Sequence, residues 1–139
     1  MLEFLQQNWL LIAGLILVAT YLFKGPLALR LYGIGSVSPT SAVSLINRQG
    51  ARVVDVREDS EWQQGHIPEA IHMPLGKLGD RMEELEPYKV GDAPLVVTCR
   101  SGNRSAMAAV RLRKAGFAAV YNLEGGTLAW QQAGMPFET

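Results

Sequence analysis

The sequence predicts an α/β domain with a mostly parallel central sheet and helices on both faces, preceded by one N-terminal transmembrane helix. Short apolar or β-branched runs alternate with helix-like segments from residue 37 onward, which is typical of parallel sheets. A stretch without charge occupies residues 4–23. The chain has 139 residues, 48% of them hydrophobic, which suits one compact domain and an appendage.

The uncharged stretch at residues 4–23 has the length of a membrane span. A helix of this length extends for about 30 Å, the thickness of the hydrocarbon core of a bilayer. Trp9 and Tyr21 stand near its two ends, as interfacial aromatic residues do. Lys24 and Arg30 lie just beyond it, so the positive-inside rule places the C-terminal part of the chain in the cytoplasm.

Two other readings of this stretch are a signal peptide and a buried core helix. A signal peptide needs a basic N-terminal region, whereas the only side-chain charge before the stretch is Glu3. Gly25-Pro26 and the glycines in residues 33–36 separate the stretch from the rest of the chain, as a linker would. We therefore predict an anchor and linker over residues 1–35 and a domain over 36–139. The protein would cross the membrane once, and in a bacterium this would be the inner membrane.

The first helix of the domain is marked at both ends. Ser38 supplies an N-cap and Pro39 the first helical position, while Gly50 ends the helix. One apolar face between them is formed by Ala42, Leu45 and Ile46.

The middle of the domain alternates strands and helices. Residues 52–56 form a β-branched strand, and a helical turn over 58–64 follows it. Residues 71–73 are a short strand, and 78–85 have the apolar spacing of an amphipathic helix. Residues 95–98 form the strand that looks most buried.

The last third continues the pattern. A helix over residues 104–115 carries basic side chains in its last turns and ends at Gly116. A strand comes next at 120–123, and a final helix begins after Gly125-Gly126 and ends at Gly134. Ligand sites of parallel sheets lie beyond the carboxyl ends of the strands, where this pattern puts Cys99.

Cys99 is the only cysteine, and it opens the segment of residues 99–105 between a strand and a helix. Backbone N–H groups and the helix dipole make such a loop attractive to anions. Arg100 and Arg104 add charge, so we expect the pKa of the thiol to lie below its ordinary value of about 8.5. A lone cysteine is more often a small buried apolar residue, but the two arginines favour a nucleophile. One free thiol also fits a reducing compartment.

Three ordered segments resemble the rhodanese (sulfurtransferase) domain family over residues 37–137. They are Val54-Asp55-Val56-Arg57 with Glu61-Trp62 and residues 65–74; Cys99 to Arg104; and Tyr121 to Trp130. The resemblance implies a rhodanese-like fold. It also implies that Cys99 takes a sulfane sulfur from an anionic donor such as thiosulfate, holds it as a persulfide without a further cofactor, and passes it to a thiol or protein acceptor.

The resemblance also suggests roles within the loop. Backbone N–H groups of residues 100–105 would stabilise the extra sulfur, and Arg100 and Arg104 would attract the donor, with Arg104 also fixing the loop. Gly102 would permit a backbone conformation or a close approach that a side chain blocks. The remaining members are expected to cap the loop or helix: Ser101, Asn103 and Ser105.

Outside the loop, Arg57 either lines the pocket or pairs with Asp55 or Glu61. Asp55 and His66 are expected to be structural. Two histidines without further ligands at suitable spacing do not suggest a metal site.

Two other enzyme classes fit the Cys99 loop less well than sulfur transfer does. A cysteine phosphatase loop has one more residue between cysteine and arginine than the four between Cys99 and Arg104, and a reductase with a resolving cysteine needs a second cysteine. A membrane-tethered binding or regulatory module without catalysis, with a membrane protein as partner, is the alternative from another class. The zero net charge does not suggest a nucleic-acid partner.

Overall fold

Five parallel strands form one sheet in the order β1-β5-β4-β2-β3, in a computed structural model that describes residues 1–89, 91 and 93–139, apart from the side chains of 24–26. The strands are Gly35–Val37 (β1), Arg52–Asp55 (β2), Ile71–His72 (β3), Leu95–Thr98 (β4) and Val120–Leu123 (β5). The predicted parallel sheet is confirmed. β4 lies in its centre, so Cys99 follows the most enclosed strand.

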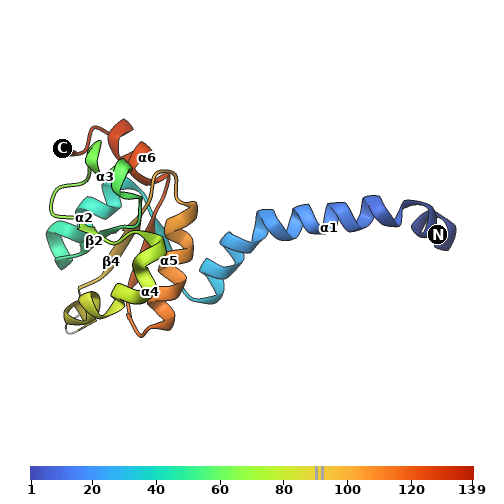
Figure 1. Cartoon of the computed structure of the whole chain (residues 1–139), viewed down its shortest axis with the longest axis horizontal. Coiled ribbons are helices and arrows are strands. Elements are labelled where there is room, and N and C mark those ends of the chain that lie inside the picture. The colour runs from blue at the N-terminus through green and yellow to red at the C-terminus, as the bar shows by residue number, and fades with distance from the viewer. Residues whose placement is uncertain (90, 92) are drawn as a thin grey trace.

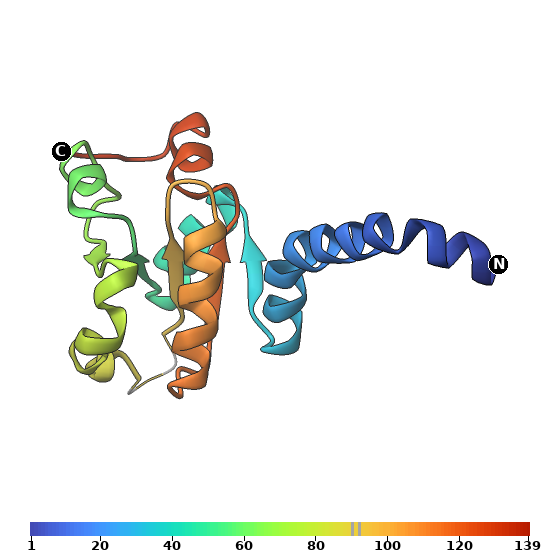
Figure 2. The same cartoon turned by 45° about the vertical axis from the view of Figure 1, so that its right-hand side comes forward.

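Helices cover both faces of the sheet, as predicted (Figures 1 and 2). On one face, Val54 and Val97 share a core with buried side chains of α4 (Leu78–Arg81) and α5 (Asn103–Lys114). On the other, Val53 and Val96 share a second core with α2 (Pro39–Gln49) and α6 (Gly126–Gln132). Adjacent residues of one strand thus enter different cores, as the pleat requires.

The ends of α2 lie where the sequence puts them. The backbone N–H of Ser41 donates to Ser38 Oγ at 3.2 Å, and Pro39 opens the helix. Gly50 ends it in the left-handed conformation, with φ of 67°. A residue with a side chain would be strained there.

The predicted helix over residues 78–85 is instead divided. A 3-10 turn, η1 (Leu75–Lys77), leads into α4, and a 3-10 segment, η2 (Met82–Lys89), comes after it. Pro87 lies inside η2, where it removes a backbone donor and disfavours α-helical geometry in the preceding residue. Leu78 and Leu85 are nevertheless both buried, so the apolar face is retained.

The N-terminal helix α1 (Leu2–Leu31) does not break where a linker was expected. It continues through positions 25 and 26, and Leu29 packs against the core beside α5. The backbone N–H of Ile34 donates to Leu29 O at 2.8 Å, and Arg113 Nε donates to Tyr32 O at 3.2 Å. The first hydrogen bond closes the end of α1 locally, and the Leu29 packing and the Arg113 hydrogen bond hold its last turns against the domain.

The outer part of α1 projects away from the domain (Figure 1). Its segment Leu2–Phe23 is long and apolar enough to cross a membrane, and none of its apolar window is buried. A signal sequence has the same length and composition. The residues from Leu27 to Leu31 continue the helix toward the domain.

Candidate active site

Cys99 lies at the floor of the loop between β4 and α5, with 1% of its surface exposed. The backbone N–H of Gly102 donates to Cys99 Sγ at 3.0 Å, and Ser105 Oγ lies 3.3 Å from the same atom. Gly102 has φ of 110°, so the loop uses its conformational freedom to turn back toward the sulfur. The loop thus presents hydrogen-bond donors to Sγ.

The pKa of Cys99 reflects two opposed effects. Burial raises it, whereas hydrogen bonds from the Ser105 side chain and from the backbone N–H groups of Ser105, Gly102 and Ser101 lower it. The hydrogen bonds prevail, so the pKa is lower than that of an ordinary thiol. The sequence analysis named both the loop amides and the arginines as causes; in the structure, the loop amides and Ser105 contact the sulfur.

Ser105 is therefore more than the helix cap that the sequence suggested. It is fully buried, and its single hydroxyl proton can point to Asn122 Oδ1 at 2.6 Å or to the Cys99 thiolate at 3.3 Å, one at a time. Asn122, on β5, in turn donates from Nδ2 to Gly102 O at 3.2 Å. Asn122 thus fixes both the hydroxyl and the loop backbone, a role that sequence analysis missed because the residue lies on another strand.

Arg104 is held by Glu61 of α3 (Asp59–Gln63). Its two terminal nitrogens donate to the two carboxylate oxygens at 2.6 and 2.8 Å. The side-chain hydrogen bonds from Arg104, opposed by burial and assisted by the backbone N–H of Glu58, lower the pKa of Glu61 to about 2. The sequence analysis predicted that Arg104 attracts the donor and fixes the loop. In the structure, its guanidinium is paired with the Glu61 carboxylate, a contact that joins the loop to α3.

Arg57 forms a buried pair with Asp55. Its Nη2 donates to Asp55 Oδ2 at 2.8 Å and to Gly65 O at 2.8 Å. Of the alternatives left open by the sequence, the ion pair with Asp55 is present, while Glu61 accepts only through its backbone oxygen, at 3.3 Å. Arg57 also lines the pocket, so the two expectations for this residue are compatible.

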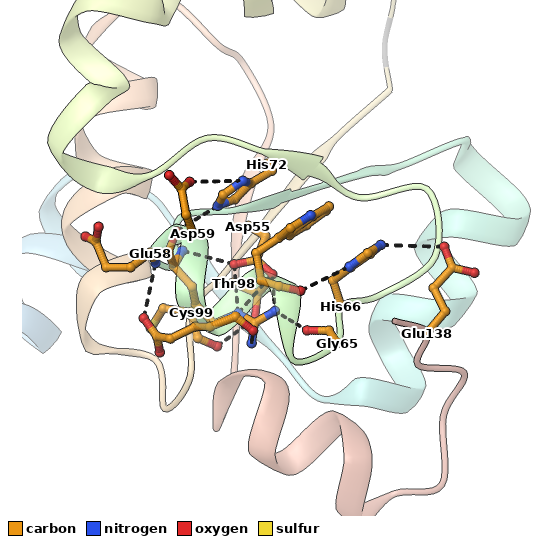
Figure 3. Close-up of polar contacts among 12 residues, drawn as sticks. Asp55, Glu58, Asp59, Gly65, His66, His72, Thr98, Cys99 and Glu138 are labelled. Carbon is orange, nitrogen blue, oxygen red and sulfur yellow. Dashed lines mark hydrogen bonds and ion pairs between the residues drawn. The ribbon is translucent and has the colours of Figure 1, made fainter.

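His66 and His72 enclose the Trp62 ring. The Trp62 and His66 centroids are 3.7 Å apart, and those of Trp62 and His72 are 4.5 Å apart. Figure 3 shows His66 turned toward Glu138 and His72 toward Asp59. This stack supports α3, which carries Glu61. In the part of the chain that the structure describes, no three His, Cys, Asp or Glu side chains are grouped as metal ligands.

A pocket of about 370 Å³ opens beside the loop, and its lining includes Arg57, Glu61, Arg100 and Phe137. Arg100 is exposed, and it has no ion pair with any residue in the described ranges. It is therefore the loop arginine whose charge is available to a ligand. The neutral wall of the pocket includes Thr127 and Leu128 of α6.

The start of α6 packs directly under the loop. The backbone N–H of Thr127 donates to Cys99 O at 2.8 Å, and that of Leu128 donates to Arg100 O at 3.1 Å. A Cβ atom on Gly126 would lie 2.4 Å from Cys99 O. This close backbone approach explains the second glycine of the Gly125-Gly126 pair.

The model of the rhodanese-like domain matches residues 38–133. The chain belongs to the rhodanese-like domain family. It is 37% identical over 92 residues to a sulfurtransferase of Allochromatium vinosum, covering 66% of this chain and 82% of that protein. It is 36% identical over 93 residues to the thiosulfate sulfurtransferase GlpE of Pseudomonas syringae pv. syringae, covering 67% and 84%.

Solved structures share the fold of this chain, and their descriptions differ. A rhodanese-related protein of Thermoplasma volcanium superposes with a TM-score of 0.65 at 31% identity, covering 74% of this chain and 96% of that one. A Rhodopseudomonas palustris protein described as a possible tyrosine phosphatase gives 0.68 at 28% identity, covering 80% and 91%. The rhodanese-like match begins after α1 and β1, so it does not include the apolar helix.

Proposed function

We propose that this chain is a membrane-anchored sulfurtransferase in which Cys99 carries a sulfane sulfur as a persulfide. The observation that supports this most is the short contact of 3.0 Å between the Gly102 N–H and Cys99 Sγ, within a loop that lowers the thiol pKa. Donors aimed at sulfur stabilise the thiolate that attacks, and they stabilise the same atom when it leaves. The family's sulfurtransferases make this the favoured use of the thiolate.

The proposed cycle has two displacements. The Cys99 thiolate attacks the outer sulfur of thiosulfate, an S–S bond to Sγ forms, and the S–S bond of thiosulfate breaks to release sulfite with the electron pair. An acceptor thiolate or cyanide then attacks the outer sulfur of the persulfide, and Sγ leaves as a thiolate. No external oxidant or reductant enters either displacement.

In this scheme, the two arginines of the loop have different roles. Arg100, exposed at the pocket, attracts the anionic donor. Arg104 is neutralised by Glu61 and instead holds the loop to α3. The outer sulfur would lie among the backbone N–H groups of residues 100–105, at the positive end of α5.

The short loop favours sulfur transfer over phosphate chemistry. Four residues separate Cys99 from Arg104, one fewer than in cysteine phosphatases, so the ring suits a single sulfur atom better than a tetrahedral phosphate. The guanidinium of Arg104 is also held by a carboxylate, whereas a phosphatase needs it for the phosphate oxygens. We therefore place the phosphatase reading behind the sulfurtransferase.

We also propose that Leu2–Phe23 spans the membrane once and keeps the domain at its cytoplasmic surface. None of the apolar window of this segment is buried, and basic residues lie just beyond it. An anchor suggests that the donor or acceptor is produced or used at the membrane.

A tethered binding module without catalysis is the second candidate, favoured by the near-complete burial of Cys99, at 1% exposure. Thiocyanate formation from thiosulfate and cyanide separates the two functions. Sulfur transfer predicts thiocyanate from the detergent-solubilised full chain and none from Cys99→Ser. Equal, background rates for both proteins with thiosulfate and with a protein persulfide would favour the binding module.

A further inference from the structure

The zero net charge of the chain conceals a strong separation of charge along the sequence. Residues 4–54 and 93–123 together contain nine of the 13 basic residues and no acidic residue. Residues 55–92 contain ten of the 13 acidic residues and four basic ones. Such a division of charge bears on what the protein surface binds and not on how the chain folds.

The fold places much of these two groups toward opposite edges of the sheet, although Arg104 and Glu61 meet at the Cys99 loop. The acid-free residues include β1, α5 and all of α1 beyond Glu3 in its first turn, and β1 is the sheet edge that comes directly after α1. The acidic residues surround β3, the other edge, and the segment from η1 to η2. In Figures 1 and 2, α1 leaves from the side of the domain where α5 and β1 lie, and η2 lies farther from it.

Five exposed residues at the junction of α1 and α5 form what we call the basic face: Leu27, Arg30, Leu31, Arg111 and Lys114. Leu27 and Leu31 are 56% and 74% exposed, while Leu29 between them packs into the core. Lys114 Nζ lies 5.1 Å from the centre of the Tyr32 ring, so the end of α5 adjoins the end of α1. The basic face therefore continues directly from the predicted membrane span.

Basic residues at the end of α5 have a second role, because they complement the negative end of the helix dipole. Arg113 lies in that last turn, and it also donates to Phe117 O and Ala118 O just beyond the helix. Arg30 lies in the last turn of α1, where it also complements a helix dipole. The dipoles do not account for the exposed leucines beside Arg30 or for the absence of acidic residues over residues 4–54.

We propose that the basic face lies on the anionic lipid headgroups of the membrane that α1 crosses, and so fixes the orientation of the domain on the bilayer. This rests on the anchor of the proposed function. Leu31 is eight residues beyond Phe23, or about 12 Å along the helix. The headgroup layer occupies about 5–8 Å of this distance. The remaining distance is shorter than the Debye length of about 8 Å at physiological salt.

An anionic bilayer fits the basic face better than nucleic acid does. Exposed leucines between the cations match the boundary between headgroups and acyl chains, and they contribute nothing to phosphate contacts on a duplex. Figures 1 and 2 show the loop between β4 and α5 at the end of α5 away from the α1 junction. Docking on lipid would thus leave the Cys99 loop open to solvent.

The test uses the full chain in vesicles of phosphatidylcholine, with and without phosphatidylglycerol. A fluorophore is attached at the exposed position 118 of a Cys99→Ser, Ala118→Cys chain, and headgroup-labelled lipid serves as the quencher. Each basic residue near an anionic surface changes the docked-to-free ratio by about fivefold. We expect quenching only in vesicles that contain phosphatidylglycerol, and we expect salt to weaken it. In the double variant Arg111→Gln, Lys114→Gln, the docked-to-free ratio should fall about 25-fold.

The matched control is Lys77→Gln with Arg81→Gln, which removes two exposed cations from η1 and α4 and should leave quenching unchanged. Equal quenching in both vesicles, or equal loss in the control, would overturn the proposal. Oligonucleotide binding by the basic face without lipid dependence would also do so. Failure of the chain to float with any vesicle would refute the anchor and this proposal together, while thiocyanate formation by Cys99 would be tested separately.

Discussion

Replacing Glu61 by glutamine isolates the pair that joins α3 to the Cys99 loop. Glutamine keeps the shape of the side chain and one oxygen acceptor, but it removes the charge that Arg104 meets at 2.6 and 2.8 Å. The loop itself and its buried contacts are unchanged. The variant therefore measures how much the charged pair contributes to stability and to the position of the loop.

The size of the effect depends on the exposure of the two side chains, 34% for Arg104 and 26% for Glu61. Exposed pairs contribute about 0–1 kcal/mol, and hydrogen bonds to charged groups in more enclosed places about 1.5–3 kcal/mol. An intermediate loss of about 1–2 kcal/mol in the free energy of unfolding at pH 7 is expected. For a domain of this size, the melting temperature should fall by roughly 4–16 °C.

The effect must also depend on pH. The pKa of Glu61 is lowered from 4.5 to about 2 in the folded chain, so its pairing stabilises the fold fully above pH 4.5. This stabilisation is lost as the pH falls through about 2. The difference in melting temperature between the wild type and Glu61→Gln should therefore be largest near neutral pH, shrink below 4.5 and vanish near 2.

The assay is thermal unfolding of the detergent-solubilised full chain, followed by circular dichroism across this pH range. Glu84→Gln is the matched control, because Glu84 also makes two hydrogen bonds to one arginine, Arg81, but on the surface. Its melting temperature should differ little from the wild type. Equal effects of the two substitutions, or a Glu61→Gln difference that does not change with pH, would refute the reasoning.

Three further predictions concern the loop. Ser105→Ala should raise the pKa of Cys99, because it removes a hydrogen bond that lowers it, and the midpoint of alkylation rate against pH should move upward; an unchanged midpoint would assign the effect to the amides alone. Arg100→Gln should raise KM for thiosulfate by about 5–10-fold with little change in melting temperature, as expected from one charge of about 1 kcal/mol near the donor; an unchanged KM would contradict its role. Gly126→Ala should lower stability by about 1–3 kcal/mol or more, because its Cβ would overlap Cys99 O at a positive φ, and a wild-type melting temperature would show that the contact can relax.

Local signals in the sequence were sufficient for most of the fold. The buried strand β4, the N-cap at Ser38 and the stop at Gly50 depend on neighbouring residues only, and all three were predicted correctly. The division of residues 75–89 into short helices was missed, because hydrophobic spacing alone does not distinguish α from 3-10 turns. Pro87 was the available signal.

The partners of the loop residues could not be predicted in the same way. Arg104 and Glu61 are 43 positions apart, and Asn122 reaches Ser105 only because β5 pairs with β4. These contacts depend on strand order, which alternating elements do not specify. The continuation of α1 past Gly25-Pro26 likewise depends on the packing of Leu29 against the domain.

The central claim is that Cys99 carries sulfur, and intact mass spectrometry of the full chain tests it directly. After incubation with thiosulfate, the wild type should gain the mass of one sulfur atom, and cyanide should remove it again. Cys99→Ser should gain nothing under the same conditions. A wild-type mass that stays unchanged with thiosulfate and with a protein persulfide would contradict the sulfurtransferase account.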